Sequence, residues 1–330
     1  MSTAAPVRQL DPASVAELRR SAARVLDAFG SSATHPGLLA RIAREAAALS
    51  PAVRHQCRPV DTAHGLFVLR GLEVDDAGIG PTPASWAVAG DAAAEWDVVL
   101  LLLATAMGNP IAWEGQQEGR FVHNIVPTAG REQEQTGASS DVLLSPHTED
   151  AFHPGRAHLL MLCCMRNPDD IATTAASVRE VRLTDEDMDC LSRPVLPILP
   201  DDAYVEAQGF AGEPPKVPTV WRSEDGPTLR FDPAYTPLGE APAAYRAAYH
   251  RLEGELSRVS RAVSLRPGEV LVVDNDLVVH GRVPFTARYD GTDRWLKRAS
   301  VRVPGRRSRP EAEALEHGYG QAALEAHAAA

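Results

Sequence analysis

The sequence predicts a mainly β fold with flanking helices, and two observations support this prediction. Between about residues 61 and 305, short runs rich in aliphatic and β-branched residues are separated by polar loops, a pattern typical of strands. The first sixty residues and the stretch 241–262 instead place apolar residues at helical spacing. We therefore expect a β core with an N-terminal helical layer, residues 1–60, and one inserted helix.

The N-terminal layer is expected to contain amphipathic helices. The segment DPASVAELRRSAARVLDAFG offers Asp11 or Ser14 as an N-cap and Gly30 as the end of the helix. The segment HPGLLARIAREAAALS repeats the helical pattern. A further helix in AAEWDVVLLLLATAMGNP should end before Gly108 and Pro110, because Gly, Asn and Pro together mark a turn.

The β core is predicted from five runs. They are GRFVHNIVP, DVLLSPHTE, HLLMLCCMRNP, EVLVVDNDLVVHGR and LKRASVRV. Strands of this kind need hydrogen-bonding partners on both sides or closure into a barrel. We therefore expect the runs to pair with one another although they are distant in the sequence.

Three further segments complete the expected organisation. The Pro/Gly-rich stretch GFAGEPPKVPTVWRSEDGP predicts a mobile loop or lid near 208–228 rather than a linker, because predicted strands lie on either side of it. A continuous helical pattern occupies 241–262, and the Ala-rich residues 306–330 predict a peripheral helix or a frayed tail. No internal repeat is visible, so we expect residues 1–330 to form a single domain.

Composition limits the kinds of partner. The chain has 330 residues, of which 44% are hydrophobic and 23% are charged, and its formal net charge is -11. This charge argues against nucleic acid and anionic membranes, since both are bound by basic surfaces. No apolar run is long enough to span a bilayer, and the N-terminus lacks the pattern of a secretory signal. We expect a soluble, cytoplasmic protein that binds small molecules; its oligomeric state is left open.

The cysteines do not indicate a disulfide framework or a zinc-thiolate site. The chain has four of them, Cys57, Cys163, Cys164 and Cys190, and none is spaced as CxxC. The adjacent pair lies in an apolar run, where a thiol usually acts as a small hydrophobic group.

The stretch SPHTEDAFHP is the first candidate for chemistry. If DVLLSPHTE is a strand, His147 and Glu149 lie two residues apart and point to the same face, while Thr148 and Asp150 face away as structural or outer-layer groups. The spacing suits two ligands of one metal ion. Taken alone, a cluster of this kind is more often a solvated surface turn than a site.

A third ligand is expected from the distant segment EVLVVDNDLVVHGRVPF, which contains His280. Two imidazoles and one carboxylate on one side of a ferrous ion form a facial triad, which leaves coordination positions open for a co-substrate and dioxygen. An isolated His280 would more often be a core histidine. Its combination with the His-x-Glu pair favours a ligand.

The segment after His280 is rich in cations. Arg282, Arg288, Arg294, Lys297 and Arg298 follow within HGRVPFTARYDGTDRWLKRASVRV, too many for a strand whose alternate side chains are buried. Arg294 and Arg298 can both point into a barrel, and a guanidinium binds a carboxylate through two parallel hydrogen bonds. A solvated basic face remains an alternative for Arg282 and Arg288. Metal and arginine together suggest a dicarboxylate co-substrate.

Several motifs resemble a known family. They are QQEGRFVHNIVP, EQTGASS, HTEDAFHP, CMRNPD and HGRVPFTARYDGTDRWLKR. These segments are similar to the clavaminate synthase-like branch of Fe(II)/2-oxoglutarate oxygenases, and in particular to hydroxylases of arginine, asparagine and enduracididine. The resemblance extends from about Phe67 to Val303. It implies a distorted double-stranded β-helix (jelly roll) with N-terminal and inserted helices.

The resemblance also implies roles for individual residues. Fe(II) would be held by His147, Glu149 and His280. The distal carboxylate of 2-oxoglutarate would be held by Arg294 with Thr174, or with the neighbouring Thr173. The amino-acid substrate would be bound by Arg298 at its α-carboxylate, and the amino end would be lined by Gln116 or Gln117 with Ser139 and Ser140. Both serines could also be plain turn residues, and either glutamine could lie on the surface.

The implied activity is hydroxylation of a free amino acid, with Fe(II) as cofactor and 2-oxoglutarate and O2 as co-substrates. Asp232 matches the position at which the relatives hold a basic side chain, which favours C3 (β) hydroxylation of arginine or an arginine-derived amino acid such as enduracididine, in the biosynthesis of a nonribosomal peptide antibiotic. An Asp before Pro is equally common in turns.

Other activities stay open at this point. Within the family they are hydroxylation of asparagine or lysine, attack at another carbon, and desaturation. Outside it, the same ligands could hold zinc in a hydrolase, although HExxH is absent from the sequence. A non-catalytic binder on a barrel scaffold is the third alternative.

Overall fold

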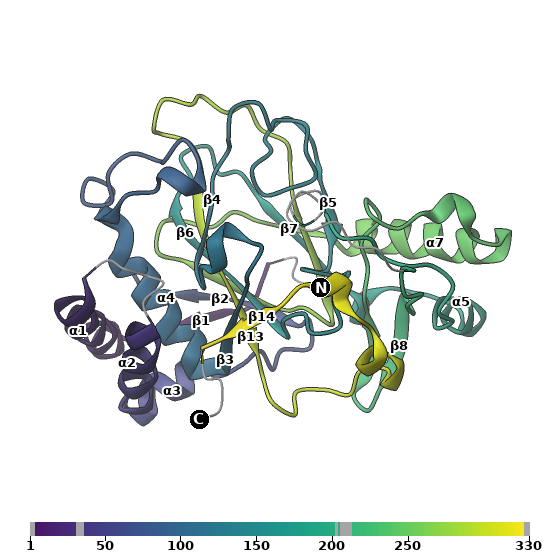
Figure 1. The fold of residues 1–330 in the computed structure, drawn as a ribbon, viewed down its shortest axis with the longest axis horizontal. Helices are drawn as coiled ribbons and strands as arrows, with labels where there is room; N and C mark the ends of the chain where they lie inside the picture. The colour runs from purple at the N-terminus through teal and green to yellow at the C-terminus, as the bar shows by residue number, and fades with distance from the viewer. Residues whose placement is uncertain (1–3, 31–35, 202–203, 205–212, 327–330) are drawn as a thin grey trace.

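Two facing groups of strands organise the chain, one sheet of eight strands and one of four (Figure 1). A computed structural model describes residues 4–30, 36–201, 204 and 213–326. The described part is mainly β with helices on its outside, in agreement with the fold class expected from the sequence.

The larger sheet runs through the middle of the molecule. In spatial order its strands are β1 (Val7–Gln9), β2 (Leu66–Arg70), β11 (Val270–Asp274), β6 (Leu159–Arg166), β13 (Trp295–Arg302), β3 (Asn109–Trp113) and β14 (Ala323–Glu325), with β4 (His123–Ile125) also paired to β13. Apart from the parallel pair β1 and β2, neighbouring strands are antiparallel.

The smaller sheet is antiparallel and carries two of the three candidate metal ligands, His147 and His280. Its order is β10 (Arg261–Val263), β7 (Thr173–Ser177), β12 (Val278–Arg282) and β5 (Leu144–His147). The turn between β11 and β12 takes the chain from the larger sheet into the smaller one. This turn contains Asn275 and Asp276.

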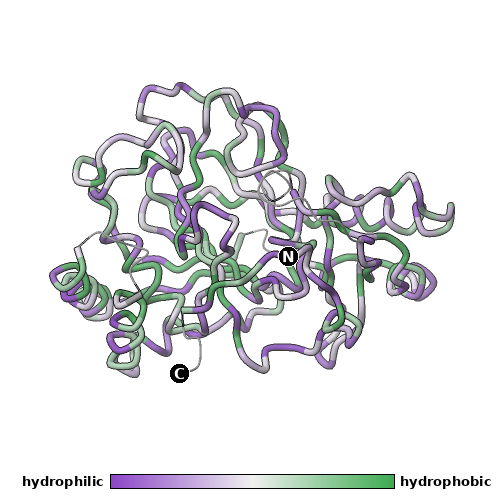
Figure 2. The backbone as a smooth tube through the Cα atoms, in the orientation of Figure 1, coloured by the Kyte–Doolittle hydropathy of each residue, from purple (hydrophilic) through white to green (hydrophobic). Residues whose placement is uncertain are grey.

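Strand β6 shows how the core is divided. Because side chains alternate along a strand, Leu160, Leu162 and Cys164 join the cluster that also contains residues of β7 and β12. Met161 and Cys163 join the cluster beneath the N-terminal helices. Both adjacent cysteines are buried and unpaired, as expected for small hydrophobic groups, and Figure 2 shows the apolar colouring concentrated in the central strands.

Two sets of helices cover the sheets. On one side lie α1 (Pro12–Phe29), α2 (Pro36–Ala47), α3 (Pro51–Gln56) and α4 (Ala94–Met107), and on the other lie α5 (Asp185–Leu191) and α7 (Ala243–Val259) (Figure 1). Asp11 is the N-cap of α1, since its side chain accepts from Ser14 N, and Gly30 ends the helix with a φ of 62°. Helix α4 is buried on nearly all sides, which explains its apolar sequence.

Short 3-10 turns connect these elements. They are Trp86–Val88, Asp91–Ala93, Gln117–Gly119, Val178–Glu180, Leu238–Glu240, Glu311–Leu315 and Gly318–Gly320. None of the helices in the described ranges is long and apolar enough to cross a membrane.

Two segments differ from the sequence prediction. The lid expected near 208–228 begins outside the described residues, and its later part forms a β-hairpin of β8 (Val220–Ser223) and β9 (Gly226–Leu229) rather than a loop. The tail, residues 306–330, is neither a helix nor frayed over its described part. It contains two 3-10 turns and then β14, which pairs with β3.

Candidate metal centre and substrate cavity

Strand pairing brings the two distant histidines together. His147 is the last residue of β5 and His280 lies within β12, and the two are direct partners in the antiparallel register. Directly opposed residues project to the same face of a sheet, so the imidazole centroids are 4.5 Å apart. The Glu149 carboxylate completes the group, with Oε2 3.3 Å from His280 Nε2 and 3.9 Å from His147 Nε2.

The donor set fits a divalent metal ion. One ligand atom from each of the three residues lies within 4.8 Å of the others. His147 Nδ1 is 2.8 Å from Ser145 O, so Nδ1 carries the proton and donates it, and the Nε2 lone pair remains for a metal. Glu149 Oε2 is buried and accepts no hydrogen bond within the described chain. Its lone pairs are therefore available to coordinate a metal ion.

The charge states of these groups also suit a metal. Burial alone would raise the pKa of Glu149, but the Arg298 guanidinium and the neighbouring imidazoles hold this pKa well below its usual range. Burial, together with the proximity of His147, lowers the pKa of His280. The site therefore presents an ionised carboxylate next to a neutral imidazole, which are the protonation states that bind metals.

Arg294 is a buried cation beside this centre. It lies directly before β13, and its Nη2 donates to Thr173 Oγ1 at 2.9 Å. No carboxylate within the described residues forms an ion pair with it, and its Nε has no hydrogen-bond partner there. Burial lowers the pKa of Arg294 to about 10. A buried guanidinium without a counter-anion is suited to an anionic ligand.

The two candidate threonines face different ways. Thr173 lines the cavity and contacts Arg294. Thr174 does not line it; its Oγ1 is buried without a hydrogen-bond partner in the described structure and lies next to Gly281. The structure thus brings Thr173, rather than Thr174, to Arg294.

Arg298, on β13, connects the carboxylate ligand to the cavity wall. Its Nη1 forms an ion pair with Glu149, and its Nη2 lies 3.2 Å from Gln116 Oε1 and 2.8 Å from His123 Nδ1. Burial and the charge of Arg298 lower the pKa of His123 to about 3. His123 therefore stays neutral and accepts from the guanidinium. His123 was not among the residues expected from the sequence, although it lies in the strand-like run GRFVHNIVP.

The two candidate glutamines have distinct contacts. Gln116 lies between Arg298 and Asp150, and its Nε2 is 3.4 Å from Asp150 Oδ1. Gln117 instead exchanges two hydrogen bonds of 3.0 Å with the backbone of Asn124. Gln116 thus contacts the polar groups of the site, whereas Gln117 holds strand β4.

Asp150 lines the cavity, so the expectation that it faces away is wrong. Strand β5 ends at His147, and Asp150 adopts a φ of 51°, so the alternation of strand side chains no longer applies. Asp150 accepts hydrogen bonds from Trp113 Nε1 at 2.6 Å and from Tyr204 Oη at 2.8 Å. Burial and the nearby Glu149 charge raise the pKa of Asp150 to about 6.

Thr148, the other residue expected to face away, does turn away from the cavity. It pairs with the backbone of Phe231.

Ser139 and Ser140 do not line the cavity but brace a further arginine. Arg282 donates to the Ser139 carbonyl and hydroxyl, the latter at 3.1 Å, and to Val142 O at 3.0 Å. Arg282 is buried and lines the cavity, so the alternative of a solvated face is wrong for it. Arg288 is solvent-accessible and pairs with Asp169.

Asp232 also lines the cavity. Its Oδ1 accepts from the backbone N–H groups of Ala234 and Tyr235 at 3.1 and 3.3 Å, the contacts of an Asx turn. Burial raises the pKa of Asp232. The residue therefore combines both expected characters, a turn former and a carboxylate that faces the cavity.

A single cavity of about 320 Å³ joins these groups. Besides the residues above, its wall includes Asp201, which was not among the residues expected from the sequence and which adds a second carboxylate to the cavity wall. A volume of this size admits small molecules rather than a polymer. The cavity wall therefore combines cationic groups, at Arg294 and Arg282, with carboxylates, at Asp201 and Asp232.

Comparisons with known proteins agree with this architecture. The chain is 36% identical over 279 residues to the enduracididine beta-hydroxylase of Streptomyces hygroscopicus, which covers 77% of this chain and 81% of that protein. A crystal structure of the non-heme iron oxygenase OrfP with Fe and alpha-ketoglutaric acid matches with a TM-score of 0.78 and 36% identity, covering 90% of this chain and 94% of OrfP. The OrfP complex with Fe, succinate and (3S)-hydroxy-L-Arg gives 0.80 and 35%, with the same coverage.

A family model covers most of the chain. Residues 43–300 match the family described as taurine catabolism dioxygenase TauD, TfdA family. This range includes all three candidate metal ligands and also Arg294 and Arg298. The chain therefore belongs to the TauD/TfdA dioxygenase family.

Proposed function

We propose that this protein is an Fe(II)/2-oxoglutarate-dependent hydroxylase that adds one oxygen atom at C3 of a free basic L-amino acid, arginine or an arginine-derived compound. The observation that carries the proposal is the cavity itself. It places a His–Glu–His donor set beside a buried guanidinium without a counter-anion, and its wall also includes the carboxylates of Asp201 and Asp232. The likeness to the enduracididine hydroxylase and to OrfP with bound 3-hydroxyarginine supports the choice of substrate and carbon.

The metal would be held by His147, Glu149 and His280. When bound, ferrous iron supplies the activation of O2 that converts 2-oxoglutarate to succinate and carbon dioxide and transfers one oxygen atom to the substrate. The protein contributes position. The opposed strands β5 and β12 fix the imidazoles, and the Ser145 carbonyl fixes the tautomer of His147.

The co-substrate would be bound through its distal carboxylate by Arg294 and Thr173. Arg294 can donate two parallel hydrogen bonds to a carboxylate, and the negative charge would compensate a cation that is otherwise buried alone. Thr173 replaces Thr174 in this proposal because it is the threonine that contacts Arg294.

The amino-acid substrate would lie between Arg298 and Asp232. Arg298 and Gln116 are placed to bind the α-carboxylate and amino end, with Asp150 close to Gln116. Asp232 and Asp201, which line the same cavity, would receive the guanidinium of the substrate. These contacts fix both ends of a long basic substrate, and the carbon that is presented to the metal follows from its length.

The fold supports the same proposal. Two antiparallel groups of strands share one core cluster, and the chain crosses between them at the β11–β12 turn. We assign this arrangement to a distorted double-stranded β-helix, and we regard residues 1–330 as one oxygenase domain. The enduracididine relative favours a role in nonribosomal peptide antibiotic biosynthesis.

A zinc hydrolase explains the cavity less well. It would use the three ligands and an attacking water but would leave Arg294 buried without an anion. The observed guanidinium therefore favours a keto-diacid co-substrate.

The test is a reaction of the purified protein with ferrous iron, 2-oxoglutarate and a panel of free L-amino acids. Arginine or a related basic amino acid should gain the mass of one oxygen, with equal formation of succinate, and NMR of the product should place the hydroxyl at C3. A panel in which only neutral amino acids react would overturn the basic preference. Asp232→Asn is the matched variant, and it should lose activity toward arginine far more than toward asparagine.

A further inference from the structure

The backbone of Glu149 needs partners that no strand supplies. Strand β5 ends at His147, so the N–H and C=O groups of Glu149 lie beyond the sheet ladder, and Glu149 is buried. Buried backbone groups without hydrogen bonds are costly, and native structures satisfy nearly all of them. Some other group must therefore hold this part of the chain.

The side chain of Asn275 satisfies both groups. Its Oδ1 accepts from Glu149 N at 2.8 Å, and its Nδ2 donates to Glu149 O at 3.0 Å and to Ala157 O at 3.1 Å. One amide thus takes the place of a neighbouring strand, since it makes both hydrogen bonds that a β-bridge would make. Asn275 is fully buried, so water does not compete for these bonds.

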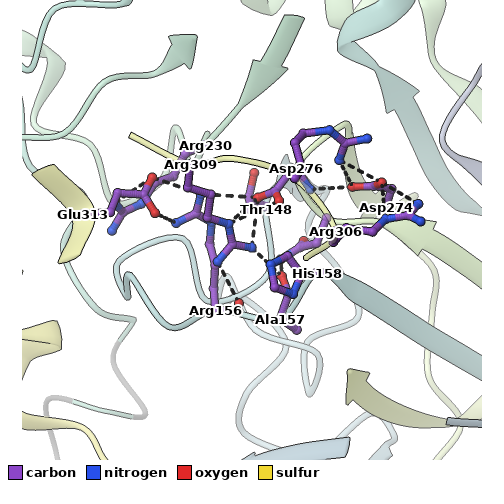
Figure 3. Close-up of polar contacts among 12 residues, drawn as sticks. Thr148, Arg156, Ala157, His158, Arg230, Asp274, Asp276, Arg306, Arg309 and Glu313 are labelled. Atoms are coloured by element: carbon purple, nitrogen blue, oxygen red, sulfur yellow. Dashed lines mark hydrogen bonds and ion pairs between the residues drawn. The ribbon is translucent and has the colours of Figure 1, made fainter. Parts of the chain in front are cut away.

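Asn275 is itself held in a fixed position. It lies in the turn between β11 and β12, only five positions before His280 in the sequence, and its own N–H donates to His158 O at 2.8 Å. The aspartates on either side of it are anchored by arginines from the C-terminal tail. Arg306 binds Asp274 at 2.9 Å, and Arg309 binds Asp276 at 3.0 Å (Figure 3).

A second contact holds the residue before Glu149. Thr148 N donates to Phe231 O at 2.7 Å, and Phe231 N donates to Thr148 Oγ1 at 3.1 Å. The chain is therefore held on both sides of the ligand position, by Phe231 before it and by Asn275 at it.

We propose that Asn275 is a positioning residue that sets the direction of the Glu149 carboxylate toward the two histidines. Because both backbone groups of Glu149 are fixed, the orientation of its Cα–Cβ bond is fixed as well. The side chain is then already directed toward the histidines before a metal ion binds. Asn275 also joins the turn that leads to His280, so it couples the positions of two ligands that are distant in the sequence. The inference rests on the proposed metal site.

The experiment measures metal binding rather than turnover. Asn275→Ala removes the three hydrogen bonds, and anaerobic calorimetric titration with Fe(II), or titration with Co(II) followed by visible absorption, gives the affinity without any substrate. We expect binding 10–100-fold weaker than in the wild type, the range typical when a group that orients a metal ligand is removed. Asn275→Ser, a milder change, should give a smaller loss and serves if the alanine variant does not fold.

Asn167 provides the matched control. Its buried side chain holds backbone in the same way, accepting from Ile171 N at 2.9 Å and donating to Ile171 O and Leu265 O, both at 3.1 Å. None of these residues lines the cavity. Asn167→Ala should lower the thermal midpoint of the metal-free protein much as Asn275→Ala does, with metal affinity unchanged.

The outcomes distinguish a failure of the proposed metal site from a failure of the positioning role of Asn275. A wild-type protein that binds neither metal would overturn the proposed metal site and this inference with it. A wild type that binds, with both Asn275 variants binding equally well, would overturn only the positioning role. Equal losses of affinity in the Asn275 and Asn167 variants would also overturn it, because the effect would then be one of general stability.

Discussion

At the scale of single residues, the Thr173–Thr174 pair shows how a strand selects one side chain for a site. Adjacent residues of a strand face opposite sides, so only one threonine of β7 can point into the cavity. Thr173 does so and accepts from Arg294, whereas Thr174 Oγ1 lies 3.0 Å from the point where a Cβ of Gly281 would stand. The two residues therefore form a natural pair of test and control.

Thr173→Val should weaken binding of 2-oxoglutarate, because it removes a hydroxyl next to the carboxylate site while keeping the shape of the side chain. A hydrogen bond to a charged group is worth about 1.5 kcal/mol or more, so we expect the KM for 2-oxoglutarate to rise about tenfold. Steady-state succinate formation measures it. Thr174→Val should leave this KM unchanged; a rise in both variants would contradict the assignment.

The sequence predicted the site residues unevenly, for a physical reason. His147 and His280 lie on strands, where side-chain direction follows from spacing and pairing, and the structure brings them together. Glu149 and Asp150 lie beyond the end of β5. Their directions depend on a local turn with a positive φ at Asp150 and on the distant Asn275, neither of which can be read from a period of two.

At the scale of elements, two strands that the sequence did not predict, β7 and β14, depend on pairing with distant strands. The strongly apolar runs that contain β6, β11 and β12 were predicted to be strands, and they are strands. Strand β7 was not predicted, because its residues TTAAS are small and weakly apolar. Strand β7 is stabilised by pairing with β12 and β10, and β14 likewise exists because β3 offers it an edge.

Gly281 lies where two strands of the small sheet approach each other closely. It lies in β12 beside His280, where the register with β5 shifts. A Cβ built at Gly281 would stand 2.4 Å from Leu144 O, a backbone atom that cannot rotate away. The strand therefore requires glycine for space, although no left-handed conformation is involved.

Gly281→Ala should lower the free energy of unfolding by about 1–3 kcal/mol, the usual cost of inserting a methyl group into packed structure, and should weaken metal binding by displacing β12. Urea unfolding of the metal-free protein measures the first effect. Gly254→Ala in α7 is the control, because no atom lies within 4 Å of its built Cβ, and it should raise stability by about 0.5–1 kcal/mol. Equal effects of both substitutions would contradict the packing argument.

At the scale of the whole molecule, the C-terminal segment holds the cavity walls through buried ion pairs. Arg156, which is fully buried, binds Glu313 at 2.8 Å and Asp276 at 3.3 Å (Figure 3). Arg230 binds Glu316 through two parallel hydrogen bonds of 3.0 and 2.9 Å and also donates to Ala151 O. A tail that looked peripheral from its Ala-rich sequence is therefore part of the interior.

The ion pair between Arg230 and Glu316 provides the test of this role. Arg230 directly precedes Phe231 and Asp232, so the pair joins the tail to this part of the chain. Arg230→Met should lower the free energy of unfolding by about 3–5 kcal/mol, since it leaves a buried carboxylate without its partner. The double variant Arg230→Met/Glu316→Leu should lower the free energy of unfolding by clearly less than the sum of the single variants, because neither charge is then left alone.

Arg222→Met is the control. Its pair with Asp185 is 2.8 Å long but exposed, so the loss in free energy of unfolding should stay below about 1 kcal/mol. Additive effects in the double variant, measured by urea unfolding, would show that the tail is attached by packing and not by this ion pair.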